Sequence, residues 1–192
     1  EFSAAPAKLA IGSRGLRMLD LASGKLSSDL GAREFALSPT GDRVVVSRDG
    51  PVPLVLLDAG TLKPIRSNPA RGFTPSLAFS GDGHTVAGAI GGVGVWFWDV
   101  DEEGRAPTFG AGETDVRGIA FSRDGARFAA SLYTAEAIRM WDIASGVPRT
   151  MSGGRPVNAL AFAPDGARLA AAGDGVFLYD TATGETVARL GE

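Results

Sequence analysis

Short apolar runs separated by turn-forming residues recur along the whole chain. Four stretches, 35–43, 77–85, 119–127 and 160–168, share one pattern of alternating apolar and small residues, a glycine turn, a polar residue and a second apolar run. Their turn glycines, Gly41, Gly83, Gly125 and Gly166, lie 42, 42 and 41 residues apart. No stretch keeps a helical apolar period, so the pattern predicts short strands and almost no helix.

A second signal keeps the same phase as the first. An apolar segment ends in an aspartate once per repeat, at Asp20, Asp58, Asp99, Asp142 and Asp180. Together the two signals divide each repeat into four strands. In the repeat where the division is plainest, we expect strands at 118–121, 127–132, 138–141 and 147–151. The Gly, Asp, Pro and Ser residues between them favour antiparallel hairpins.

The period of about 40 residues, the Trp-Asp pairs at 98–99 and 141–142 and the four strands per unit resemble the WD-repeat family. The resemblance implies an all-β fold, a β-propeller of four-stranded antiparallel blades with five blades visible and the first truncated. We expect one domain, 1–192, with blades at about 1–31, 32–71, 72–113, 114–154 and 155–192. Small residues would lie on the inner strands, and bulky ones would fill the space between blades: Ala36, Ala78, Ala120 and Ala161, then Trp98, Trp141 and Tyr179.

Two ways of completing the ring stay open. Phe2 and Ser3 align with Phe162 and Ala163, so only a stub of the first innermost strand is present. This favours a segment of a larger ring, with further blades or a catalytic domain upstream. The alternative is a ring of five blades, within the range of four to eight that propellers show.

Composition narrows the class of partner. The net charge of −3 gives no electrostatic argument for nucleic acid. The chain has no cysteine, which excludes a thiolate metal site, and no apolar run long enough to span a membrane. We expect no metal and no cofactor. The abundance of Ala, Gly and Arg suggests a bacterial origin, and we expect a cytoplasmic location.

Acidic residues and the single histidine offer little catalytic chemistry. His84 has no second His or Cys to share a metal, so we expect a solvated turn residue. The repeated aspartates are one blade apart and are expected to accept backbone N–H bonds in turns. Residues 101–103 form an acidic insertion, either solvated or able to bind a cation or a basic partner.

The candidate binding residues are arginines and aromatics. In the family's architecture, the loops between the last strand of one blade and the first of the next share a face with the loops between second and third strands. Arginines recur in those first loops, and aromatics accompany them: Arg33, Arg71, Arg117 and Arg155, with Phe73 and Tyr133. Trp96 is either an exposed anchor or a residue packed between blades.

These residues favour a non-catalytic scaffold or sensor module that binds a protein or peptide. The chain resembles the repeat domains appended to bacterial kinases, proteases or signalling ATPases. Two alternatives are a propeller enzyme of the hydrolase or lactonase type and a carbohydrate-binding propeller. The inner strands offer no histidine for the first, and the loops differ too much between repeats for the second.

Overall fold

The computed structural model describes residues 8–12, 15–27, 29–48, 54–68, 76–90, 94–102, 115–152 and 156–191. Every regular element in these ranges is a β-strand, and no helix able to cross a membrane occurs there. The strands are β1 (Lys8–Gly12), β2 (Leu16–Asp20), β3 (Glu34–Leu37), β4 (Arg43–Ser47), β5 (Leu54–Asp58), β6 (Pro64–Asn68), β7 (Leu77–Phe79), β8 (Thr85–Ile90), β9 (Gly94–Asp99), β10 (Val116–Phe121), β11 (Arg127–Leu132), β12 (Ala137–Asp142), β13 (Pro148–Ser152), β14 (Val157–Phe162), β15 (Arg168–Gly173), β16 (Val176–Asp180) and β17 (Thr186–Leu190).

The strands form five separate antiparallel sheets, each built from consecutive segments of the chain. We name them sheet A (β1–β2), sheet B (β3–β6), sheet C (β7–β9), sheet D (β10–β13) and sheet E (β14–β17). Sheets B, D and E have four strands, and the described residues give three to C and two to A. The prediction of all-β structure with four-stranded antiparallel units is thus confirmed. The four strands expected in sheet D occur within two residues of their predicted bounds.

Four hydrophobic clusters join the five sheets in sequence order. One lies between A and B, the next between B and C, the third between C and D, and the last between D and E. The interior sheets therefore bury both of their faces. In the C–D cluster, Phe128 is fully buried and contacts Phe97 and Trp141, with ring centroids 5.1 and 5.8 Å away.

In the third strand of a sheet, the position of a side chain relative to the final Asp determines which neighbouring sheet it packs against. The residue immediately before the final Asp packs against the preceding sheet, as Trp98, Trp141 and Tyr179 do. The residue one place earlier packs against the following sheet, as Phe97 and Met140 do. Alternation along a strand explains the rule, because successive side chains point to opposite faces. We call these the backward face and the forward face of a sheet.

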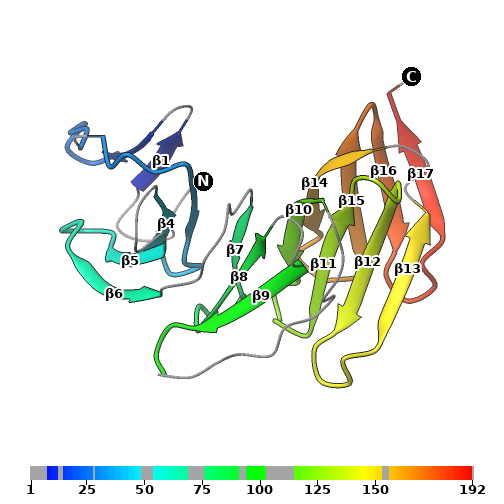
Figure 1. Ribbon diagram of the computed structural model, residues 1–192. Helices are drawn as coiled ribbons and strands as arrows, with labels where there is room; N and C mark the ends of the chain where they lie inside the picture. Colours follow the sequence, from blue (N-terminus) through cyan, green and yellow to red (C-terminus); the bar gives the residue numbers. More distant parts are fainter. Residues whose placement is uncertain are drawn as a thin grey trace.

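Figure 1 shows the sheets following one another from the blue N-terminal region to the red C-terminal region. The first strands of successive sheets contact one another, β3 with β7, β7 with β10 and β10 with β14. Small residues there, such as Ala36 and Ala120, allow the sheets to approach closely at this side. The described sheets thus form a propeller-like array in which no sheet closes on itself.

The repeated aspartates form turns, as the sequence predicts. The carboxylate of Asp142 accepts the backbone N–H of Ser145 at 2.9 Å and its hydroxyl at 2.9 Å. The equivalent carboxylates of Asp20, Asp58, Asp99 and Asp180 also accept backbone N–H groups two or three residues ahead. These bonds stabilise the ionised form, so the pKa of Asp142 lies below its usual value.

A serine organises the turn between the first and second strands in three of the sheets. In sheet D the Ser122 hydroxyl accepts the Arg127 N–H at 2.9 Å and donates to Asp124 at 2.5 Å. Ser38 and Ser80 accept the corresponding N–H groups in sheets B and C. In sheet E the place belongs to Ala163, although Asp165 still accepts the Ala167 N–H at 2.9 Å.

Candidate functional site

Each antiparallel sheet presents two edges where the chain turns. One edge, which we call the loop edge, carries the connections between sheets and those from second to third strands. The opposite turn edge carries the connections from first to second and from third to fourth strands. The predicted binding residues of the described ranges can be placed on this frame. Arg71, Phe73 and Arg155 lie outside the described residues.

Arg117 and Tyr133 meet at the loop edge of sheet D. Arg117 lies near the start of β10, and Tyr133 directly follows β11, so the antiparallel pairing of these strands brings the two residues together. The Arg117 guanidinium carbon lies 4.4 Å from the centroid of the Tyr133 ring. This is a cation–π contact, in which the negative face of the ring attracts the cation. Two of the predicted residues therefore form one exposed feature.

Asp115 fixes the geometry of this pair. Its carboxylate accepts the Arg117 Nε–H at 3.0 Å, and its carbonyl accepts the Tyr133 N–H at 3.0 Å. Asp115 adopts φ 63°, a left-handed conformation in which Asp is more common than most residues. The Arg117 side chain stays 47% exposed, while Tyr133 is half-buried. The terminal guanidinium nitrogens thus face solvent with their orientation already set.

Arg33 and Trp96 occupy different surroundings. Arg33 is exposed just before β3, where its backbone N–H donates to the Ser47 carbonyl at 2.8 Å. It belongs to sheet B, and sheet C separates it from the Arg117–Tyr133 pair. Trp96 packs in the B–C cluster, and its ring covers Gly88 on the neighbouring strand. Its half-buried position agrees with packing between sheets, the second of the two readings that the sequence allows.

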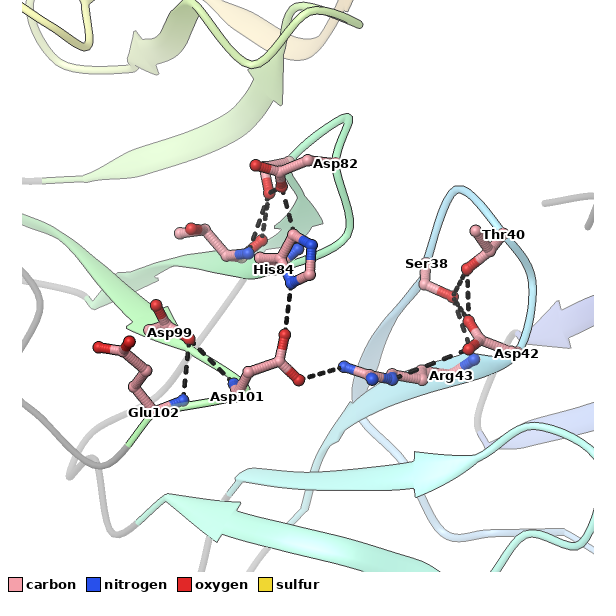
Figure 2. A network of polar contacts seen from close by, with 11 residues as sticks. Ser38, Thr40, Asp42, Arg43, Asp82, His84, Asp99, Asp101 and Glu102 are labelled. Atoms are coloured by element: carbon pink, nitrogen blue, oxygen red, sulfur yellow. Dashed lines mark hydrogen bonds and ion pairs between the residues drawn. The ribbon is translucent and has the colours of Figure 1, made fainter.

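The turn edge holds a polar network that joins sheets B and C. Figure 2 shows Asp101 between His84 of its own sheet and Arg43 of sheet B. The Arg43 guanidinium donates to Asp101 at 2.8 Å, and the His84 Nδ1 contacts the other carboxylate oxygen. The Asp101 bond raises the pKa of His84, and the His84 bond lowers the pKa of Asp101. His84 is exposed in the turn before β8, as the sequence predicts, and its imidazole in addition contacts Asp101.

Arginines also join sheets D and E at the turn edge. Arg127 donates to the Thr181 hydroxyl and to the Gly166 carbonyl, each at 2.9 Å, and Arg149 donates to the Ala182 carbonyl. An open cleft of about 540 Å³ lies beside these contacts. The arginines of this cleft therefore hold two sheets together. Arg117 differs from them because, within the described residues, its guanidinium contacts Asp115 and Tyr133 at the loop edge of its own sheet.

The described residues contain no group of three or more His, Cys, Asp or Glu side chains placed to hold a metal ion. Among the described carboxylates, the five turn aspartates are each bonded to nearby backbone N–H groups. These five aspartates lie at the turn edge, whereas the exposed charged residues of the loop edge include Arg33, Arg117, Glu136 and Asp174.

Comparison with known proteins gives one result that agrees with the repeat. The family model of the WD domain, G-beta repeat (WD40), matches residues 147–177. The matched stretch covers β13 of sheet D, then β14, β15 and the start of β16 in sheet E, which is most of one period. No curated protein matches the chain. The match supports a relationship to WD-repeat proteins, whose repeats generally build protein-interaction scaffolds.

Proposed function

We propose that the chain is a non-catalytic scaffold that binds a protein or peptide through the loop edge. The observation that carries the proposal is the Arg117–Tyr133 pair, an exposed cation–π contact held by both polar groups of Asp115. The WD40 match supports an interaction role in general terms. Arginine and tyrosine are the residue types that interface hot spots favour, because each offers a large contact area and polar bonds together.

The pair defines what the partner must offer. The guanidinium presents planar N–H donors, which carboxylates accept in a bidentate arrangement. The Tyr133 ring supplies an apolar surface beside them. Asp115 places a negative charge 3.0 Å from the Arg117 Nε, so the edge carries mixed charge rather than a uniform positive field. This balance favours a short peptide segment with one carboxylate and a flanking apolar side chain.

The test begins with peptides selected from a displayed random library on the folded chain. Their dissociation constants are then measured on Arg117→Ala, Tyr133→Ala and Arg123→Ala by isothermal calorimetry. Arg123 is an exposed arginine in the turn after β10, at the opposite edge of the same sheet, and serves as the matched control. We expect each of the first two substitutions to weaken binding at least tenfold, about 1.4 kcal/mol, and Arg123→Ala to leave binding unchanged.

Two conservative variants separate the contributions of charge and shape. Tyr133→Phe keeps the ring beneath the guanidinium and is expected to retain most of the affinity. Arg117→Lys keeps the charge but loses the planar donors, so it is expected to lose most of the affinity. Peptides that bind Arg117→Ala and Tyr133→Ala as well as the wild type would exclude the loop edge of sheet D as the binding surface.

A further inference from the structure

The interface between sheets B and C contains an arginine that binds a carboxylate of the next sheet. Arg43 is the first residue of β4 and pairs with Asp58, the final residue of β5. Its guanidinium donates to the Asp101 carboxylate at 2.8 Å, as Figure 2 shows, and Asp101 lies two residues after the final Asp of β9. This interface therefore shows what an arginine at the start of a second strand binds when the neighbouring sheet offers a carboxylate.

The interface between sheets D and E has the same arginine but lacks that carboxylate. Arg127 is the first residue of β11 and pairs with Asp142, as Arg43 pairs with the final Asp of its own sheet. The residue two places after the final Asp of sheet E is Ala182, whose methyl group offers no acceptor. At the C–D interface the arginine itself is replaced, because β8 begins with Thr85. Sheets D and E thus combine the basic residue with an empty acidic position.

Two guanidinium groups border the cleft between sheets D and E, and sheet E fixes both of them. Arg127 uses a single nitrogen, Nη1, to bond the Gly166 carbonyl and the Thr181 hydroxyl, each at 2.9 Å. Arg149 uses its Nη1 to bond the Ala182 carbonyl. All these acceptors are neutral, and within the described ranges the Nε and Nη2 groups of both arginines have no acceptor. Two positive charges with unused donors are therefore held beside the cleft.

One acidic residue of the described ranges, Asp142, also lines the cleft. Its carboxylate accepts the backbone N–H and the hydroxyl of Ser145, each at 2.9 Å. Asp58 holds the equivalent place in sheet B, yet Arg43 still binds a carboxylate from the next sheet. The final Asp of a sheet therefore does not take the place of that carboxylate. Two arginines and one aspartate leave the lining with a net positive charge.

The size and the apolar rim of the cleft indicate a peptide segment. Its volume of about 540 Å³ lies within the range of about 300–1,000 Å³ that is common for ligand pockets. Val147, Pro148 and Met140 line it together with the arginines, and Val147 is 64% exposed. A ligand with an apolar side chain next to its carboxylate would cover this surface and bond the guanidinium groups at once.

We propose that this cleft binds an acidic peptide segment whose Asp or Glu carboxylate lies between Arg127 and Arg149. The ligand carboxylate takes the role that Asp101 has between sheets B and C. Charged hydrogen bonds between guanidinium and carboxylate groups are about twice as strong as neutral ones, and the fixed arginines are already oriented. The cleft lies at the turn edge, opposite the Arg117–Tyr133 pair. It is a second binding site, separate from the one proposed at the loop edge.

NMR titration of the isotope-labelled chain with two capped peptides, acetyl-Val-Glu-Val-amide and acetyl-Val-Gln-Val-amide, tests the proposal. The peptides have nearly the same shape and differ in the carboxylate. The glutamate peptide is expected to shift the backbone amide signals of Val147, Arg149 and Ala182 in a saturable way, with a dissociation constant on the order of 1 mM for so short a ligand. The glutamine peptide is expected to bind at least about tenfold more weakly.

Ala182→Asp restores the missing carboxylate and keeps both arginines. It is expected to weaken binding of the glutamate peptide at least about tenfold, because the chain's own carboxylate then bonds the guanidinium groups. Ala144→Asp is the matched control, since Ala144 is exposed two residues after the final Asp of sheet D and faces an interface without the arginine. It adds the same charge and is expected to keep the affinity within about twofold. Circular dichroism establishes that both variants are folded.

Arg149→Met removes one guanidinium from the exposed side of the cleft and is also expected to weaken binding at least about tenfold. Equal affinity for the two peptides, unchanged affinity in Ala182→Asp, an equal loss in Ala144→Asp, or no saturable shift of the cleft signals up to about 10 mM would each overturn the proposal. Shifts confined to the signals of Arg117 and Tyr133 would also overturn it, while supporting the function proposed for the loop edge.

Discussion

The Ser122 turn allows a local effect to be worked out in both directions, because Ala163 holds the place of Ser122 in sheet E. Ser122 is 1% exposed, and its hydroxyl is the acceptor for the Arg127 N–H. Substitution by alanine leaves that N–H without its bond, which costs about 1–3 kcal/mol for a buried group. The reverse substitution, Ala163→Ser, offers the same hydroxyl to a turn that lacks it. We expect it to stabilise the chain by about 0.5–1.5 kcal/mol.

Urea unfolding followed by tryptophan fluorescence measures both changes. An unchanged dependence of free energy on denaturant concentration would show that stability, rather than the unfolded state, has changed. A second measurement uses Asp124, whose pKa is lowered chiefly by the Ser122 hydroxyl. Its carboxyl resonance in Ser122→Ala should titrate nearer the ordinary value of 3.8. The reasoning fails if Ser122→Ala lies within about 0.3 kcal/mol of the wild type, or if Ala163→Ser destabilises the chain by as much.

Three further predictions follow from the described contacts. His84, the single histidine, should titrate above 6.5 by NMR, and Asp101→Asn should move its pKa back toward that value. Because the folded pKa is raised, the ion pair stabilises the fold below pH 6.5, and this contribution disappears as the pH rises through the folded pKa. Gly88→Ala places a methyl group 2.3 Å from a Trp96 ring carbon. It should lower the free energy of unfolding, measured in urea, by about 1–3 kcal/mol, and the added substitution Trp96→Val should restore part of that loss. In Asp142→Asn, the free energy of unfolding should fall less steeply than in the wild type as the pH drops from 3.8 to about 3. The ionised Asp142 carboxylate stabilises the wild type, and this contribution is lost as the pH falls through its lowered folded pKa.

The repeat made the sheets and turns predictable because their determinants are local. The glycine spacing and the apolar runs place the strands of sheet D within two residues of where they occur. Asp142 and its equivalents form the expected turns because each carboxylate bonds N–H groups two or three residues away. Short separation along the chain is the common property of these successes.

Contacts between sheets were not predictable in the same way. Arg43 and Asp101 are 58 residues apart, and no spacing in the sequence indicates that they meet. The acidic insertion was open to a cation or a basic partner, and the structure gives Asp101 two basic side chains of the same chain. Trp96 is similar, because its packing in the cluster between sheets B and C depends on how those two sheets are placed. Such contacts depend on the relative placement of strands and sheets.

Because the two faces of each sheet differ, the array has a direction: every forward face meets the backward face of the next sheet. Insertion or removal of a whole four-strand unit still leaves each forward face packed against a backward face. A unit in the reverse orientation would instead bring two bulky backward faces together. The family match runs from β13 to the start of β16 and so includes residues from both sides of the junction between sheets D and E. Gain or loss of a whole period is thus the change in length that this architecture tolerates best.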